Sequence, residues 1–205
     1  MTADFWGKAC KDLAKSDPIM RKLIRVYGKA PLKSRGNAFE TLFRSIVGQQ
    51  ISVKAAQSVW NKTTALVDVT DPQSVLSKEK ALLRTAGLSE RKVEYVKDLA
   101  RHFVNREVHP LQWSKMTDEE IIDELIQIRG IGRWTAEMFL IFHVLRPNVF
   151  PVDDLGLQKG ISVQYKKRYP MSERQLALFR KKFDPWCSVA TWYLWRALDP
   201  IPVEY

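Results

Sequence analysis

The sequence predicts an all-α protein, and two observations support this fold class. Apolar residues recur with the 3.6-residue period of a helix along almost every segment, and no run alternates convincingly with the period of two typical of a strand. Helix-start signals also recur, among them Asp17-Pro18, Ser52, Ser89 and the capping box Thr117-x-x-Glu120. With 205 residues and 45% hydrophobic content, the chain suits one compact unit over residues 1–205, or two small lobes that share a cleft.

Taken in order, these signals place each helix. Residues 4–14 form the first one, and Pro18 at the first helical position and Gly28 as a stop define the second, residues 18–27, before a loop over 29–36. The later helices are expected to run from Phe39 to Gly48, from the cap Ser52 through Trp60, from Asp71-Pro72, from the cap Ser77 to Gly87, from the cap Ser89, from the Thr117 capping box, from Asp153-Asp154, from the capping box Ser172-x-x-Gln175, and from Asp184-Pro185.

Composition narrows the functional classes. The formal net charge of +10 favours an acidic partner, either nucleic acid or an anionic membrane face. The start of the chain lacks the features of a secretory signal, no apolar run reaches membrane-spanning length, and the only cysteines are Cys10 and Cys187, so an intracellular, reducing location is expected. Two cysteines cannot ligate a four-iron cluster, and no zinc-binding or phosphate-loop pattern is present, so no such cofactor is expected.

A glycine-containing hairpin at about residues 118–142 is the most informative stretch. Two amphipathic segments flank Arg129-Gly130-Ile131-Gly132. The glycines allow positive φ and the close approach of another molecule's backbone, and the amides that open the second helix form a potential phosphate site. Without further context, two such glycines could also be an ordinary helix cap and turn.

A pair of carboxylates follows the hairpin. Val149-Phe150-Pro151-Val152 leads to Asp153 and Asp154, which can cap a new helix at Leu155 and leave one carboxylate facing a cleft. Taken alone, either aspartate is most simply a helix N-cap. A hairpin that holds phosphates, followed by such a carboxylate, suggests chemistry on DNA.

These features resemble the helix-hairpin-helix plus Gly/Pro/Asp motif of the base-excision DNA glycosylase superfamily, in particular its DNA-3-methyladenine glycosylase II branch. RSIVGQQISVKAA at 44–56 is similar to the DNA-wedge helix and loop of that branch, AGLSERKVEYVKDLA at 86–100 to the segment before the hairpin, and DPWCSVATWYLWRAL at 184–198 to its closing aromatic helix. The resemblance covers roughly residues 38–198 and implies two helical lobes with the hairpin and an active-site cleft at their junction.

The resemblance also implies the catalytic and base-binding residues. Aligned on the aspartate pair, the catalytic carboxylate is Asp154, with Asp153 as a cap or structural partner; aligned on Pro-Val-Asp, as in the 8-oxoguanine branch, it would be Asp153. Trp134 and Trp195 match the family's base-stacking tryptophans, and Trp192 shares a helix face with Trp195. Indole faces favour positively charged alkylated bases by cation–π attraction. Of the other tryptophans, Trp60, Trp113 and Trp186 are expected in the core.

Further residues are expected to contact DNA or an ion. Backbone amides around Gly130 and Gly132, the Arg133 side chain and the Thr135 hydroxyl would lie near a phosphate. Gln50 matches the family's intercalating side chain, although a turn glutamine is an equal alternative. The resemblance further implies a structural monovalent cation on the carbonyls of Ile126, Ile128 and Ile131.

The expected activity is therefore monofunctional removal of alkylated purines from DNA. Bifunctional glycosylase/lyases of the superfamily carry a Schiff-base lysine where this chain has Trp134, so strand cleavage should be weak or absent. The expected partner is double-stranded DNA that contains alkylated bases, with no membrane and no required cofactor, and the protein is expected to be a monomer. The alternative is a non-catalytic helix-hairpin-helix module that binds distorted duplex by its shape.

Overall fold

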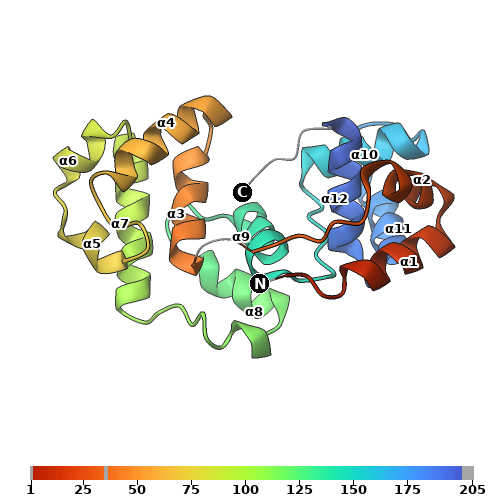
Figure 1. Ribbon diagram of the computed structural model, residues 1–205, viewed down its shortest axis with the longest axis horizontal. Coiled ribbons are helices and arrows are strands. Elements are labelled where there is room, and N and C mark those ends of the chain that lie inside the picture. The colour runs from red at the N-terminus through yellow and green to blue at the C-terminus, as the bar shows by residue number, and fades with distance from the viewer. Residues whose placement is uncertain (1, 35–36, 200–205) are drawn as a thin grey trace. The chain divides into compact units, whose positions relative to one another are not determined.

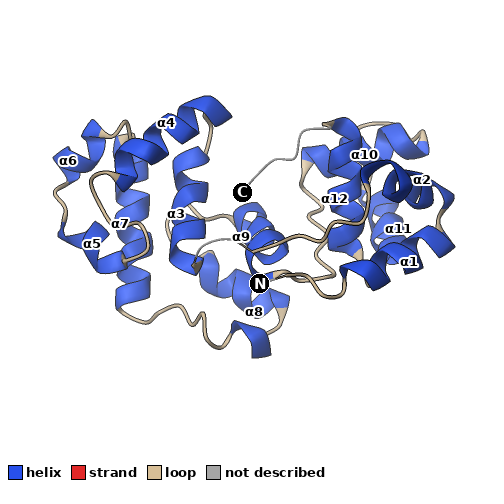
Figure 2. Cartoon of the chain, viewed as in Figure 1, coloured by secondary structure: helices blue, strands red, loops and turns tan. Residues whose placement is uncertain are grey.

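The computed structural model describes residues 2–34 and 37–199. Residues 35–36 at the end of the predicted 29–36 loop, and both ends of the predicted unit 1–205, lie outside this part. Within it, the chain consists of helices and loops with one isolated bridge between Thr2 and Lys33 and no strand, which confirms the predicted all-α class (Figure 2). No helix in the described part is long and apolar enough to span a membrane.

The described residues divide into two compact units, which we treat separately. Within the described residues, unit 1 combines 2–34 and 140–199, and unit 2 comprises 37–139. Unit 1 contains α1 (Trp6–Ser16), α2 (Pro18–Tyr27), a π-helical turn η2 (Leu140–Val144), α10 (Leu155–Tyr165), α11 (Glu173–Phe183) and α12 (Cys187–Leu198). Unit 2 contains α3 (Ala38–Gly48), α4 (Val53–Thr64), α5 (Pro72–Ser77), α6 (Lys80–Thr85), α7 (Glu90–Val104), the 3₁₀ turn η1 (Trp113–Lys115), α8 (Asp118–Leu125) and α9 (Arg133–Phe139).

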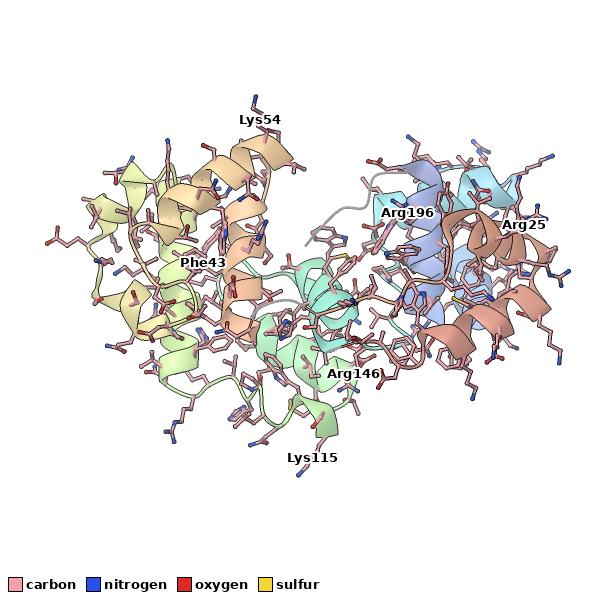
Figure 3. All side chains as sticks on the ribbon, viewed as in Figure 1. Arg25, Phe43, Lys54, Lys115, Arg146 and Arg196 are labelled. Atoms are coloured by element: carbon pink, nitrogen blue, oxygen red, sulfur yellow. The ribbon has the colours of Figure 1, made fainter. Side chains whose placement is uncertain are left out.

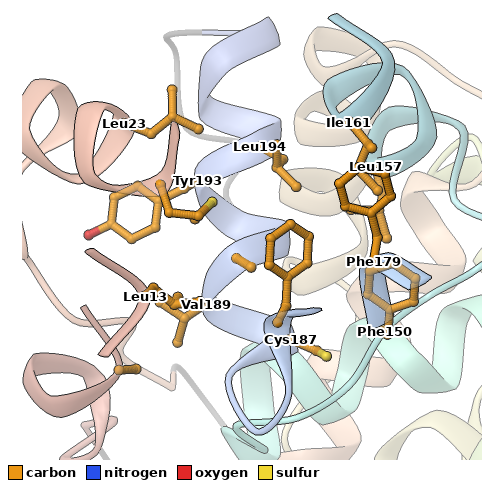
Figure 4. Close-up of a cluster of buried hydrophobic side chains, with 14 of the residues drawn as sticks. Leu13, Leu23, Phe150, Leu157, Ile161, Phe179, Cys187, Val189, Tyr193 and Leu194 are labelled. Atoms are coloured by element: carbon orange, nitrogen blue, oxygen red, sulfur yellow. The ribbon is translucent and has the colours of Figure 1, made fainter. Parts of the chain in front are cut away.

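Helix α12 is the centre of unit 1. It packs against α1, α2, α10 and α11, and its apolar side chains, including Val189, Tyr193 and Leu194, contribute to a continuous core (Figures 1 and 4). Gly160 lets α10 approach closely, because a Cβ at this position would lie 2.9 Å from the carbonyl oxygen of Leu194. The apolar core therefore fixes α10, and with it Asp154, against α12.

A buried carboxylate also links three helices of unit 1. Asp17 is the N-cap of α2 and accepts hydrogen bonds from the amides of Ile19 and Met20. It further accepts from the Tyr165 hydroxyl at 3.0 Å and pairs with Lys182 Nζ at 2.9 Å. Burial alone would raise the pKa of Asp17, but hydrogen bonds from Lys182, Met20 and Tyr165 outweigh it, so this pKa lies below its ordinary value.

Helix α7 is the centre of unit 2. It packs against α3, α5 and α6, while α3 also contacts α4 and α9, and α8 packs on α9 (Figure 1). Phe43 meets Phe39 edge-on within α3 and Trp60 edge-on across α3 and α4, and Trp113 meets Phe139 in the same way. Trp60 and Trp113 are buried, as predicted, whereas Trp186 in unit 1 is only half-buried and stacks on Phe5.

Most of the predicted helix starts are confirmed. Asp17, Ser52 and Ser89 accept hydrogen bonds from amides of the helices they precede, and both capping boxes form, from Thr117 to Glu120 and from Ser172 to Gln175. The first helix starts at Trp6, two residues later than predicted, and α4 continues four residues beyond Trp60.

Two predicted helix starts are wrong. Ser77 closes α5 and its hydroxyl donates back to the carbonyl of Ser74, so α6 begins at Lys80 without a side-chain cap. Asp184 ends α11, because its amide still donates to the carbonyl of Arg180 and its carboxylate accepts from Asn148. Helix α12 therefore begins only at Cys187.

Candidate active site and DNA-binding hairpin

Asp154 begins α10, and its carboxylate is held from two sides. The residue is the N-cap of α10 and only 8% exposed. Its Oδ1 accepts a hydrogen bond from the backbone amide of Leu157 at 2.5 Å and another from the indole Nε1–H of Trp195 at 2.8 Å. These donors and the positive end of the helix dipole stabilise the charged carboxylate. A carboxylate fixed in this way can stabilise positive charge that develops beside it.

The neighbouring Asp153 has a different environment. Its side chain is exposed, and the cap of α10 is formed by Asp154. Of the two roles expected for Asp153, a cap or a structural partner, the cap is therefore wrong. The reason is geometric: Asp154 directly precedes Leu155, the first residue of α10, and has the extended N-cap backbone (φ −72°, ψ 113°) that lets its side chain reach the amide of Leu157.

Trp195 links Asp154 to an aromatic neighbour. The half-buried indole donates its N–H to Asp154 and stacks on Phe142, with ring centroids 5.8 Å apart and an interplanar angle of 15°. Phe142 lies in the π-helical turn η2, a helix type often found at functional sites. Neither this turn nor Phe142 is predicted by the sequence, because a local widening of a helix leaves no periodicity signal.

Gly156 makes the contact between Asp154 and Trp195 possible. A Cβ at this position would lie 3.1 Å from Asp154 Oδ1 and 3.1 Å from Trp195 Cδ1, closer than side chains normally pack. A glycine in the first turn of a helix, two residues after a candidate catalytic residue, is the sequence signal that corresponds to this contact.

Trp192 faces a different environment from Trp195. Its ring meets Trp6 edge-on at 5.5 Å and Tyr193 at 4.9 Å, and the Arg196 guanidinium lies over it at 5.6 Å. Trp192 packs against the core of unit 1 as a half-buried side chain. Although Trp192 and Trp195 lie three residues apart on α12, the hydrogen bond to Asp154 comes from Trp195.

The predicted hairpin is formed by α8, the turn over residues 126–132 and α9 in unit 2. Gly130 has φ +87°, and a Cβ there would come within 2.3 Å of the Tyr95 ring, so only glycine fits. The Gly130 carbonyl accepts a hydrogen bond from Gln49 Nε2 at 2.8 Å, and the Arg129 amide donates to the buried Asp98 at 2.8 Å. Side chains from α7 and from the α3–α4 loop therefore hold the turn.

The second glycine of the hairpin faces open space. A Cβ on Gly132 would meet no atom within 4 Å, and the Gly132 carbonyl accepts the first hydrogen bond of α9, from the Ala136 amide. Gly132 is therefore required neither for its backbone conformation nor for internal packing. Its exposed position at the start of α9 leaves room for an approaching molecule.

The three residues after Gly132 differ in accessibility. Arg133 forms a two-bond ion pair with Glu119, at 2.6 and 2.9 Å, and its Nε lies 3.3 Å from Glu137; the hydrogen bond to Glu119 raises the pKa of Arg133. The Trp134 side chain is 41% exposed, whereas Thr135 is buried. Arg133 and Trp134 are therefore accessible at the surface, although the Arg133 guanidinium is already paired with acidic side chains, whereas Thr135 is not accessible.

The three carbonyls assigned to a cation follow the end of α8. Ile126 is the C-cap of α8, and the Ile128 carbonyl accepts a hydrogen bond from the Ile131 amide at 3.1 Å. Ile128 and Ile131 bury their side chains, whereas Ile126 is 40% exposed. Carbonyl oxygens beside the negative end of a helix dipole suit a cation, so the residues fit the implied ion.

Gln50 lies at an exposed turn of unit 2. It has φ +59°, and it connects α3 to α4. Ile51 and Val53 beside it are also exposed, and Figure 3 shows Lys54 projecting from the start of α4. The turn therefore presents polar, apolar and basic side chains together.

Both cysteines are buried free thiols of unit 1. Burial raises the pKa of Cys10, and it raises the pKa of Cys187 to about 12. Both thiols are therefore protonated at neutral pH and belong to the core.

A glycine-containing helical hairpin and a capped aspartate that follows it in the chain define the helix-hairpin-helix class of DNA-repair folds, and the comparisons agree. Residues 43–180 match the HhH-GPD superfamily of base excision DNA repair proteins, and the chain belongs to this family. The resemblance inferred from the sequence is thereby confirmed.

Several relatives resemble the chain over most of its length. DNA-3-methyladenine glycosylase 1 of Schizosaccharomyces pombe is 29% identical over 198 residues, which cover 92% of this chain and 86% of the relative. The crystal structure of a DNA-3-methyladenine glycosidase from Bacillus halodurans matches with a TM-score of 0.83 and 31% identity, over 97% of this chain and 92% of the other. The S. pombe 3-methyladenine DNA glycosylase Mag1, in complex with abasic DNA, matches with a TM-score of 0.76 and 28% identity, over 92% and 95% of the two chains.

Proposed function

We propose that this protein is a monofunctional DNA glycosylase that removes alkylated purines, of the 3-methyladenine and 7-methylguanine type, during base excision repair. The observation that carries the proposal is the Asp154 carboxylate, held by the Leu157 amide and the Trp195 indole at the start of α10. The relatives named as 3-methyladenine glycosylases support the substrate class.

The proposed reaction is hydrolysis of the N-glycosidic bond. As the bond between C1′ and the base nitrogen breaks, its electron pair leaves with the base, which neutralises the positive charge of the alkylated ring. The sugar becomes positively charged, and the Asp154 carboxylate stabilises this charge and orients a water molecule. The water oxygen bonds to C1′, and its proton passes to the carboxylate or to solvent. The products are the free base and an abasic site.

The aromatic side chains would provide selectivity. A cationic alkylated base is attracted to an electron-rich indole face, and the exposed Trp134 suits this role. Trp195 contributes through its N–H, which orients Asp154, as well as through its ring. Trp192, on the same helix as Trp195, would support Trp195 from the core of unit 1. Because Trp134 replaces the Schiff-base lysine of the lyases, the abasic strand should stay intact.

The duplex would be bound mainly through the hairpin. The backbone amides at the half-buried Gly130 and the exposed Gly132 suit a phosphate, and Gln50 at the tip of its turn suits the gap left when a base leaves the stack. Arg133 must exchange Glu119 for a phosphate to contribute, and the buried Thr135 would act by supporting the helix start. A monovalent cation on the carbonyls of Ile126, Ile128 and Ile131 would strengthen the turn. We expect a monomer that needs no other cofactor.

Base release from methylated duplex DNA tests this proposal. The protein is incubated with the duplex without nucleotide or divalent metal, freed purines are identified by chromatography, and strand breaks are scored separately before and after alkaline treatment. We expect methylated purines to be released and the strands to break only after alkali. Strand breakage without alkali would contradict the monofunctional assignment. Binding of abasic duplex without release of any base would favour a non-catalytic binding module.

A further inference from the structure

Gln49 joins two segments of unit 2 that are far apart in the sequence. It is half-buried at the end of α3, and its Nε2 donates a hydrogen bond of 2.8 Å to the Gly130 carbonyl, 81 residues away. Gln50, the next residue, is exposed and has a left-handed backbone with φ +59°. The loop that presents Gln50 is therefore bonded directly to the turn of the hairpin.

Side chains of helix α7 contact both the end of α3 and the turn of the hairpin. Its Lys92 Nζ donates to the Val47 carbonyl at 2.7 Å, next to the end of α3. One turn further along, the ring of Tyr95 packs against Gly130 so closely that a Cβ there would clash. Helix α7 thus contacts both the loop and the hairpin, and the Gln49 side chain forms a direct hydrogen bond between them.

We propose that Gln49 is a positioning residue that couples the Gln50 loop to the hairpin, so that both contact a damaged duplex as one preorganised element. The inference rests on the proposed function, because it assigns a task to two DNA-contacting segments of that function. A role in DNA contact for the hairpin or for Gln50, taken separately, does not require the hydrogen bond that the half-buried Gln49 side chain makes between these two segments.

The physical advantage is a lower cost of binding. Unstacking a nucleotide costs free energy, and ordering a loop during binding adds to this cost. A loop that is already fixed to the phosphate-binding turn is ordered before the duplex arrives. A phosphate held at the hairpin then places the loop tip at a defined distance along the strand.

The test is a double-mutant cycle measured in three backgrounds. Gln50→Ala alters the loop tip, and Gly132→Ala puts a methyl group on the open face of the hairpin. Dissociation constants are measured for a duplex that contains a stable abasic-site analogue, so that no catalytic turnover is needed. The cycle is run in the natural chain and again with Gln49→Met, which keeps the length of the side chain but removes the donor. Gln73→Met, at an exposed glutamine of α5, is the matched control background.

We expect coupling only where Gln49 is present. In the natural chain and in Gln73→Met, the effect of the double variant should differ by about threefold or more from the product of the two single effects. In Gln49→Met, the effects should multiply to within about twofold. Gln49→Glu has the same shape but cannot donate a hydrogen bond while it is ionised, so it should behave as Gln49→Met does. If Gln49→Met fails to fold, Gln49→Glu takes its place in the cycle.

Hydrogen exchange of the free protein tests the bond without DNA. Amides of residues 130–132 should exchange faster in Gln49→Met than in Gln73→Met. Unchanged exchange, or coupling that persists without the Gln49 donor, would overturn this inference and leave the proposed function standing. Failure of the natural chain to prefer abasic over intact duplex would instead overturn the proposed function, and the inference with it.

Discussion

The two hairpin glycines should respond in opposite ways to the same substitution. Gly130→Ala forces a side chain into the left-handed region, at a cost of about 1–2 kcal/mol. It also places a Cβ 2.3 Å from the Tyr95 ring, and such overpacking costs about 1–3 kcal/mol. The sum is about 3 kcal/mol, which corresponds to a fall in Tm of roughly 6–12 °C for a chain of this size. Gly132→Ala meets no atom within 4 Å and should change the stability by less than about 0.5 kcal/mol.

DNA binding should show the reverse ranking once stability is taken into account. A methyl group at Gly132 would obstruct a phosphate that the hairpin amides bind, and losing a hydrogen bond to a charged group costs about 1.5–3 kcal/mol. The expected loss of affinity for abasic duplex is therefore about 10–100-fold. Thermal unfolding followed by circular dichroism and a fluorescence-anisotropy titration measure the two quantities. A Gly132→Ala variant that binds as tightly as the natural chain would refute the hairpin contact, and a Gly130→Ala variant of unchanged Tm would refute the packing argument.

Three further predictions concern single side chains. Trp195→Phe keeps a ring but removes the donor to Asp154, so single-turnover base release should slow by about 10–100-fold while abasic duplex still binds; an unchanged rate would exclude the positioning role. Asp17→Asn should lower Tm at neutral pH, because it weakens the contact with Lys182. The pKa of Asp17 is lower in the folded than in the unfolded protein, so the carboxylate contributes to stability above the unfolded pKa and loses this contribution as the pH falls through the folded pKa. The difference in Tm between Asp17→Asn and the natural chain should therefore shrink below about pH 4. A difference in Tm that does not change with pH would contradict the assignment. Glu119→Gln frees Arg133 from one ion pair and should strengthen duplex binding at low salt, and weaker binding would argue against a phosphate contact by Arg133.

Sequence reasoning succeeded where a local signal determines the structure. The capping boxes at Thr117 and Ser172 and the Pro18 start specify their helices by backbone hydrogen bonds within four residues, so they could be predicted directly. Ser77 and Asp184 have the same residue types but end helices instead of beginning them. Their roles depend on which neighbouring backbone groups are already bonded, and composition does not reveal this.

The site was only partly predictable for a similar reason. Asp154 and Trp195 could be singled out by resemblance, but the hydrogen bond between them depends on the packing of α10 against α12 and on the small Gly156. Phe142 and Gln49 act through contacts with residues far away in the chain. Such contacts arise from tertiary packing and have no spacing rule in the sequence.

The most direct test of the account compares Asp154→Asn with Asp153→Asn in single-turnover release of 3-methyladenine. The two variants remove one negative charge each from adjacent positions, so they differ in location and not in net charge. We expect Asp154→Asn to slow release by at least about 100-fold and to keep most of the affinity for abasic duplex, because the lost carboxylate acts on the charged transition state. Asp153→Asn should stay within about threefold of the natural chain, as expected for an exposed surface side chain. Equal rates for Asp154→Asn and the natural chain, or a larger loss in Asp153→Asn, would contradict the central claim.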